Sequence, residues 1–158
     1  FVETFNDEVG FPVRFGVVAL ISASGAYMNS RSVGRVGMRN VVFRAMLALG
    51  VASAVYAVLV ANAALPGSLI FPAYVGFMIA VFMTISLSIG NLNSLAMEPM
   101  GHLAGMAASV ILAISTAGGA ILGSIPALFY DGTPLAPATL VALYCFGVVA
   151  ALWRVANA

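Results

Sequence analysis

The chain has few charged side chains, and their scarcity limits the classes of protein to which it can belong. It has no lysine and one cysteine, and beyond Arg14 it has only two acidic residues, Glu98 and Asp131. Charged residues make up 7% of the chain, whereas a soluble domain has about a quarter. A single cysteine, Cys145, excludes an internal disulfide. The net charge of +1 argues against nucleic acid as a partner, because binding a nucleic acid backbone needs an extended basic surface.

The residue combinations that carry enzyme chemistry are also missing. The sequence has no Ser-His-Asp or Cys-His set, no paired carboxylates and no glycine-rich phosphate loop. Glu98 and His102 lie four residues apart, but a metal or acid–base site needs further ligands or a nucleophile, so we interpret them as a loop ion pair or helix cap. We therefore expect no catalytic residue, no metal and no cofactor, and we do not expect an enzyme.

Apolar residues in runs as long as a helix dominate the rest of the chain. Hydrophobic residues make up 63% of it, and its mean hydropathy is +1.11. A bilayer core takes about 20 apolar residues to cross as a helix, and turn-forming residues such as Pro66 and Gly67 separate several runs of that length. We predict an all-α fold, a polytopic transmembrane bundle that occupies residues 1–158 as one domain. The five predicted spans cover about residues 11–27, 41–62, 69–90, 103–129 and 138–155.

The arginines predict how this bundle is oriented. Five of them fall on one side of a five-span arrangement: Arg31, Arg35, Arg39, Arg44 and Arg154. The other side has only Arg14. Short loops rich in arginine stay in the cytoplasm, so we expect that side and the C-terminus to be cytoplasmic. Arginine without lysine, with much Ala, Gly and Val, suggests a GC-rich bacterial source and hence the bacterial inner membrane.

The arginine-rich segment between the first two spans also forms a motif. It reads Asn-x-Arg and then Gly-Arg-x-Gly-x-Arg, over Asn29, Arg31, Gly34, Arg35, Gly37 and Arg39. We expect a helix end, a tight turn that glycine permits, and a basic start to the next helix. The arginines there can bond the last carbonyls of the first span. On the residues alone, fixing the topology by positive charge explains the motif equally well.

This motif resembles the cytoplasmic loop between helices eight and nine of the major facilitator superfamily. Asn29 and Ser30 stand where the superfamily's related loop has an acidic residue, so the charge relay of the full motif is absent. Within the superfamily, the motif resembles the corresponding loop of the bicyclomycin-resistance type of multidrug efflux transporter. A second stretch, residues 104–109 (Ala-Gly-Met-Ala-Ala-Ser), resembles the start of helix eleven in that type.

The resemblance covers all five spans and implies that they correspond to helices eight to twelve of such a transporter. It implies a secondary active drug–proton antiporter that exports small amphipathic or hydrophobic molecules across the lipid bilayer. Because Phe1 is not an initiator methionine, we expect the N-terminal half of the same transporter to be missing from this chain.

Polar residues inside the spans are the candidates for lining a substrate cavity. Thr84, Ser88 and Asn91 follow i, i+4, i+7 spacing and so share one helix face, and Ser109 and Thr116 share another. At that depth a polar side chain is expected to face the bundle interior or a cavity. The cavity candidates are Ser22, Thr84, Ser88, Asn91, Ser109 and Thr116. Serine and threonine can equally bond carbonyls of their own helix, so both interpretations stay open.

Small residues four apart mark the fourth span. They include Gly101, Gly105, Gly119 and Gly123. Such residues let helix backbones approach closely in lipid, so we expect these four to pack against another helix. The alternative to a transporter is a non-transporting membrane scaffold or assembly subunit that uses these faces for helix association.

Overall fold

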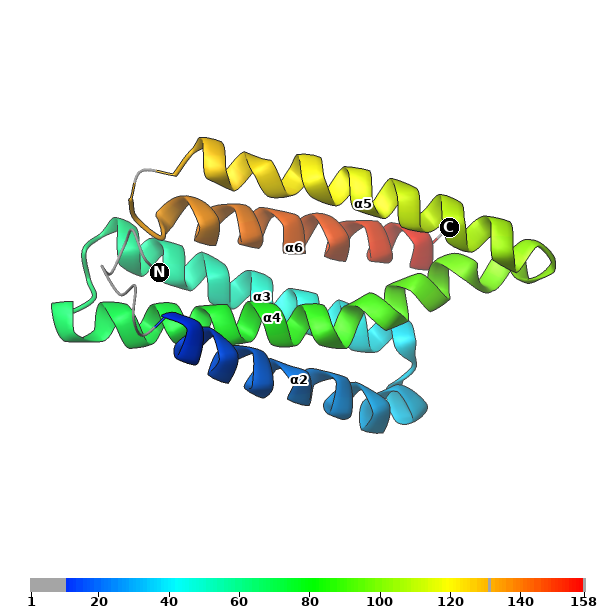
Figure 1. Cartoon of the computed structure of the whole chain (residues 1–158), viewed down its shortest axis with the longest axis horizontal. Coiled ribbons are helices and arrows are strands. Elements are labelled where there is room, and N and C mark those ends of the chain that lie inside the picture. The colour runs from blue at the N-terminus through cyan, green and yellow to red at the C-terminus, as the bar shows by residue number, and fades with distance from the viewer. Residues whose placement is uncertain (1–10, 131, 158) are drawn as a thin grey trace.

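The computed structural model describes residues 11–130 and 132–157, and its regular structure there is entirely helical. Five α-helices run alternately up and down (Figure 1), and a short 3-10 segment, η1 (Glu98–Leu103), joins the third to the fourth. The helices are α2 (Phe11–Val36), α3 (Met38–Ala61), α4 (Gly67–Met97), α5 (Ala104–Leu128) and α6 (Leu135–Ala156). The predicted all-α class is confirmed.

Four of the helices, α3 to α6, are long and apolar enough to cross a membrane. The predicted first span, about residues 11–27, lies in α2, which is not one of these four. The last third of α2 carries Asn29, Arg31 and Arg35, so its composition is mixed. The structure therefore has the five expected helices, of which four match the composition of a span.

The helices extend beyond the predicted spans where the sequence turns polar. α2 continues to Val36, and a single residue, Gly37, separates it from α3. The φ angle of Gly37 is 84°, a left-handed conformation that favours glycine. Similarly, α4 runs to Met97, although the predicted third span ends at about residue 90. Hydropathy marks where apolar composition stops, whereas a helix continues as long as its backbone bonds are satisfied.

The helices pack in a chain of neighbours, α2 on α4, α4 on α3, and α3 on α6. At the α3–α6 crossing, a Cβ added to Gly50 would lie 3.1 Å from the Cβ of Cys145. Between α3 and α4, the rings of Tyr56 and Phe77 stack with centroids 5.1 Å apart. Ala138 of α6 completes this apolar cluster. A glycine thus allows the close approach of α3 to α6, whereas two stacked aromatic rings fill the space between α3 and α4.

α5 lies at the edge of the bundle and makes few contacts with α4 and α6. Within its described residues only Ala107 is buried. The Tyr144 hydroxyl of α6 donates a hydrogen bond to the Leu122 carbonyl of α5 at 2.8 Å. Pro126, four residues after Leu122, has no N–H to give that carbonyl. One side chain of α6 therefore replaces a backbone bond that α5 lacks.

Large apolar side chains cover the outer faces of the helices. Leu20 is 77% exposed, Ile114 68% and Leu128 79%. Soluble monomers rarely expose apolar patches larger than a few hundred Å². An apolar outer surface on four helices of this length is expected for helices that lie in the hydrocarbon core of a bilayer.

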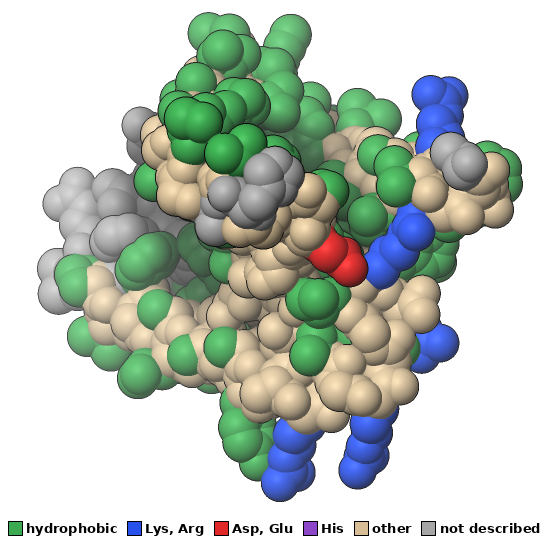
Figure 2. All heavy atoms as spheres, turned by 90° about the vertical axis from the view of Figure 1, so that its right-hand side faces the viewer, with side chains coloured by type: hydrophobic (Ala, Val, Ile, Leu, Met, Phe, Trp, Pro, Cys, Tyr) green, Lys and Arg blue, Asp and Glu red, His purple; other side chains and the backbone are tan. Residues whose placement is uncertain are grey.

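Two ends of the bundle are used as reference points below. The Gly37 end holds the α2–α3 junction, the η1 segment and the last turn of α6 (Figure 1). The Pro66 end holds the α3–α4 turn and the start of α6. Figure 2 looks at the Gly37 end and shows arginine side chains spread around its rim.

Candidate functional site: a cleft between α4 and α5

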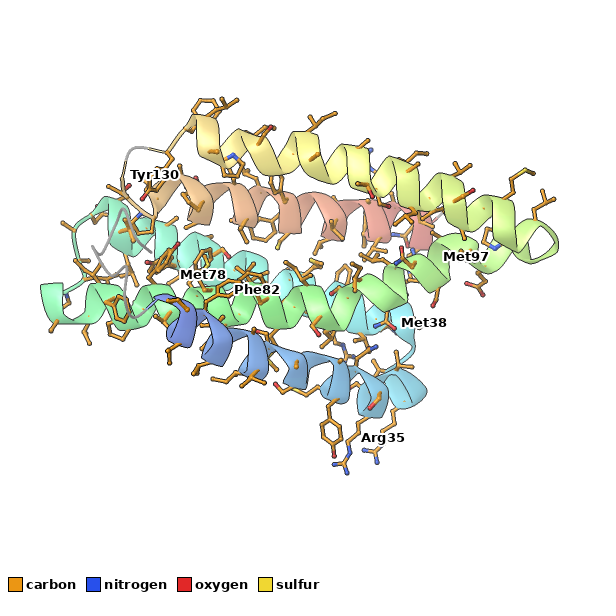
Figure 3. All side chains as sticks on the ribbon, in the orientation of Figure 1. Arg35, Met38, Met78, Phe82, Met97 and Tyr130 are labelled. Carbon is orange, nitrogen blue, oxygen red and sulfur yellow. The ribbon has the colours of Figure 1, made fainter. Side chains whose placement is uncertain are left out.

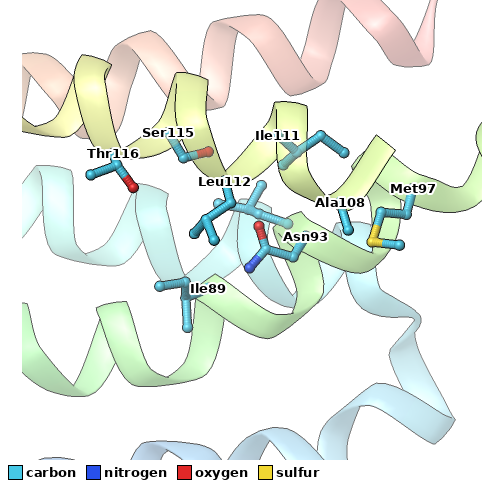
Figure 4. A pocket seen from close by; sticks show the side chains of 9 residues that line it. Ile89, Asn93, Met97, Ala108, Ile111, Leu112, Ser115 and Thr116 are labelled. Atoms are coloured by element: carbon cyan, nitrogen blue, oxygen red, sulfur yellow. The ribbon is translucent and has the colours of Figure 1, made fainter. Parts of the chain in front are cut away.

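A cleft separates α4 from α5 in the half of the bundle nearest the Gly37 end. The last turns of α4 curve away from α2 and lead into η1 (Figure 1). The resulting cavity has a volume of about 450 Å³. Residues of both helices line it (Figure 4): Ile89, Leu92, Asn93, Met97, Ala108, Ile111, Leu112, Ser115 and Thr116.

Three of these residues bring hydrogen-bonding groups to an otherwise apolar wall. Within the part of the chain that the structure describes, the side chains of Asn93, Ser115 and Thr116 have no hydrogen-bond partner. By contrast, the Ser109 and Ser124 hydroxyls of α5 donate to carbonyls of their own helix, at 2.9 and 2.8 Å. The polar groups of the cleft are therefore available to a ligand.

The lining limits the chemistry that the cleft can perform. It combines aliphatic side chains and a methionine with one amide and two hydroxyls, and no ionisable side chain lines it. Figure 4 shows Asn93 and Thr116 directed into the space between the helices. Apolar walls with a few placed polar groups, in a volume of several hundred Å³, are typical of small-molecule sites. The cleft suits an amphipathic or hydrophobic molecule that has one or two hydrogen-bonding atoms.

The structure places one predicted cavity residue, Thr116, in this cleft. Ser109 is exposed and bonded to the Met106 carbonyl, and Thr84 is half-buried on α4 outside the cleft. Sequence reasoning missed Asn93 and Ser115. Asn93 lies between the predicted third and fourth spans, and Ser115 lies in the predicted fourth span but was not among the cavity candidates.

The other predicted cavity residues lie in or beside the interface of α2 and α4. The Asn91 amide donates to Oδ1 of Asn29 at 2.6 Å, and the Asn29 amide donates back at 3.4 Å. Asn91 is 4% exposed and also donates to the Leu87 carbonyl. Ser22 is buried and bonded to the Val18 carbonyl of its own helix at 2.6 Å. Ser88 is buried on the helix face of Asn91, and its hydroxyl has no partner in the described residues.

Close backbone contact accompanies these polar groups at the α2–α4 crossing. A Cβ added to Gly25 would lie 2.5 Å from the Met83 carbonyl oxygen, closer than real Cβ atoms approach. Gly25 lies four residues before Asn29 and so on the same side of α2. One glycine and one pair of amides thus lie at this crossing, and we had assigned neither to packing.

The arginine motif forms helical structure rather than the loop that we predicted. Asn29, Arg31, Gly34 and Arg35 all lie in α2, and only Gly37 breaks the helix. The guanidinium of Arg31 lies 5.1 Å from the centre of the Tyr27 ring. Arg35 extends away from the bundle (Figure 3). The predicted tight turn is confirmed at Gly37 alone.

Arg39 bonds a carbonyl near the C-terminal end of α6, whereas we expected it to bond the end of the first span. Its guanidinium donates to the Leu152 carbonyl of α6, and not to the end of the first span. A cation at that position also meets the negative end of the α6 dipole. Because Arg39 follows the break at Gly37, its side chain belongs to α3, which packs against α6.

The four glycines predicted to pack have no neighbouring helix in the structure. A Cβ added to Gly101, Gly105, Gly119 or Gly123 would meet no heavy atom within 4 Å among the described residues. Gly25 and Gly50 are instead the glycines at helix crossings. The faces of α5 that carry Gly119 and Gly123 are open.

The fold and the cleft together define an all-α protein with four helices suited to spanning a membrane and a small-molecule-sized cleft between two of them. Comparison with protein-family models, with curated proteins and with solved structures finds no match to the chain.

Proposed function

We propose that the chain is the C-terminal part of a secondary transporter of the major facilitator type, a multidrug exporter of the bacterial inner membrane. In this proposal α2 to α6 are helices eight to twelve, and all five cross the bilayer. The α4–α5 cleft forms part of the substrate cavity. The observation that carries the proposal is the unpartnered Asn93, Ser115 and Thr116 in an apolar wall between two helices suited to spanning.

The motif resemblance supports the same assignment and its orientation. The Gly37 end, with Arg31, Arg35, Arg39, Arg44 and Arg154, faces the cytoplasm under the rule for positive charges. The cleft then lies in the cytoplasmic half of the membrane, where a hydrophobic substrate would arrive from the cell. A transporter of this type binds its substrate between two related halves, so these helices supply one wall.

The role of the cleft residues follows from their chemistry. Ile89, Leu92 and Leu112 would bind the apolar body of a substrate, while Asn93 and Thr116 would bind its polar atoms. Since no ionisable side chain lines the cleft, residues outside it would carry the proton of a drug–proton antiporter.

Transport by the full-length protein tests this proposal. We would reconstitute it in proteoliposomes and follow several lipophilic dyes under an imposed proton gradient. We expect Thr116→Val and Asn93→Leu to change the KM for some dyes several-fold while others are unaffected. The matched control is Thr139→Val, because Thr139 bonds carbonyls of its own helix on α6 and lies outside the cleft. No gradient-driven transport, or cleft variants that behave like Thr139→Val, would contradict the proposal.

The open glycine faces of α5 favour one other candidate, a non-transporting scaffold or assembly subunit. Gly119→Leu would then abolish association with a partner membrane protein in a chain that transports none of the dyes. Transport by the wild-type protein decides against the scaffold.

A further inference from the structure

A second cavity lies at the Gly37 end, where α2, α3 and α4 meet. Its volume is about 320 Å³, and it shares no residue with the α4–α5 cleft. The residues that line it come from the last turns of α2, the first turns of α3 and the middle of α4: Ser32, Val36, Val41, Arg44, Ala45 and Leu87.

The cavity combines one cation, one hydroxyl and an apolar wall. In the described residues, neither the Arg44 guanidinium nor the Ser32 hydroxyl has a hydrogen-bond or ion-pair partner. Two other arginines at this end are already engaged, Arg39 with the Leu152 carbonyl and Arg31 with the Tyr27 ring. Arg44 and Ser32 are the donors left over at this cavity.

The Gly37 end, where Arg44 lies, carries more positive than negative charge among the described residues. Among the residues that the structure describes, Glu98 is the one carboxylate, whereas this end carries five arginines. Arg44 lies six residues into α3, about 9 Å along the helix from Met38. In the membrane placement proposed above, that depth is near the boundary between headgroups and acyl chains. A cation at that depth requires an anion or water to compensate its charge.

We propose that this cavity binds the phosphate of an anionic phospholipid of the cytoplasmic leaflet. Arg44 donates two parallel hydrogen bonds to phosphate oxygens, as a guanidinium does best, and Ser32 donates a third. Val36, Val41 and Leu87 contact the glycerol and the first methylenes of an acyl chain. The bound lipid bridges α2, α3 and α4 beside the break at Gly37. This inference rests on the membrane placement of the proposed function and not on transport.

Lipid binding by the purified full-length protein tests the site. We would add phosphatidylglycerol to the protein in a mild detergent and count bound lipids by native mass spectrometry. We expect Arg44→Gln to lower the affinity about tenfold, the effect of losing charge-assisted hydrogen bonds. Arg44→Lys keeps the charge but not the paired geometry, so we expect a smaller loss.

Matched controls separate this site from general attraction to a basic end. Arg35→Gln removes an equal charge from the same end at a residue outside the cavity, and we expect less than a twofold change, as for a screened surface charge. Zwitterionic phosphatidylcholine is expected to bind more weakly, and glycerol phosphate is expected not to displace the lipid. Protection of the buried Cys145 thiol confirms that each variant is folded.

Three results would overturn the inference. Equal losses in Arg35→Gln and Arg44→Gln would show an unspecific surface effect. Equal binding of both lipids would exclude a site for anions, and full displacement by glycerol phosphate would show a site for soluble anions. A protein that binds phosphatidylglycerol through Arg44 but transports nothing would contradict the proposed function and leave this inference standing.

Discussion

Tyr144 completes a backbone interaction that Pro126 removes. In a regular helix the N–H of residue 126 would bond the Leu122 carbonyl, but proline has no N–H. The Tyr144 hydroxyl donates to that carbonyl instead, at 2.8 Å. In the hydrocarbon core of a bilayer, a carbonyl without a hydrogen bond raises the free energy of the folded state. This bond is therefore expected to stabilise both α5 and its contact with α6.

Replacing Tyr144 by phenylalanine tests this contact. We expect Tyr144→Phe to lower the free energy of unfolding by about 1 kcal/mol, the usual effect of losing one hydrogen bond. Heating the protein in detergent with a thiol-reactive dye measures it, because the one cysteine, Cys145, is buried until the protein unfolds. In a Pro126→Ala background the helix regains its own N–H, so the effect should shrink. An equal loss in both backgrounds would show that the Leu122 bond is not its cause.

The side-chain amides of Asn29 and Asn91 donate hydrogen bonds to each other across α2 and α4. We expect Asn29→Ala and Asn91→Ala each to destabilise the protein, and the double variant to lose less than the sum. The coupling should be about 1 kcal/mol, as for one buried hydrogen bond. The same thermal assay measures it. Strictly additive losses would mean that the pair contributes nothing as a pair.

At the α2–α4 crossing, glycine allows an approach that alanine would prevent. A methyl group on Gly25 would meet the Met83 carbonyl oxygen at 2.5 Å, whereas one on Gly16 of the same helix would meet nothing within 4 Å. Alanine is otherwise the better helix former by about 1 kcal/mol.

The two substitutions should therefore have opposite signs. We expect Gly16→Ala to be neutral or to raise the thermal midpoint slightly, and Gly25→Ala to lower the stability by about 1–3 kcal/mol as the helices are forced apart. Circular dichroism and the Cys145 assay report the midpoints. Equal shifts in the two variants would show that α2 and α4 do not touch at Gly25.

Arg39 connects the start of α3 to the last turn of α6. We expect Arg39→Gln to speed amide hydrogen exchange at Trp153 to Ala156, because the α6 end loses its guanidinium donor and a favourable charge. Arg35→Gln serves as the control of equal charge change. Unchanged exchange in Arg39→Gln would exclude the contact as a stabiliser of α6.

The sequence predicted the number and order of the helices well, because apolar runs and turn residues such as Pro66 and Gly132 are local signals. It predicted their neighbours poorly. Thr84, Ser88 and Asn91 do share a helix face, but spacing within one helix does not reveal that α2 covers part of it. Likewise, nothing in the composition separates Ser115, whose hydroxyl has no partner in the described part of the chain, from Ser109, whose hydroxyl donates to a carbonyl of its own helix. The spacing of residues along a helix predicts which of them share a face, whereas tertiary packing decides which neighbouring helix covers that face.

The whole molecule combines an apolar outside with a polar rim at one end. Large apolar side chains are exposed along α2 to α6, while the described arginine side chains gather at the Gly37 end (Figure 2). Such a distribution is typical of a bundle that has one depth and one orientation in a bilayer. The open faces of α5, which bury little against α4 and α6, leave room for further helices beside it.

The orientation of the bundle can be measured with single cysteines in the full-length protein. With Cys145 replaced by alanine, we expect a membrane-impermeant maleimide to label Ser68→Cys, exposed at the Pro66 end, on intact cells. Met100→Cys, exposed in η1 at the Gly37 end, should react only after the membrane is permeabilised. The reverse pattern would mean that the arginine-rich end faces outward, and with it both the cleft and the Arg44 cavity. Labelling of both positions on intact cells would mean that α4, which joins them, does not cross the membrane.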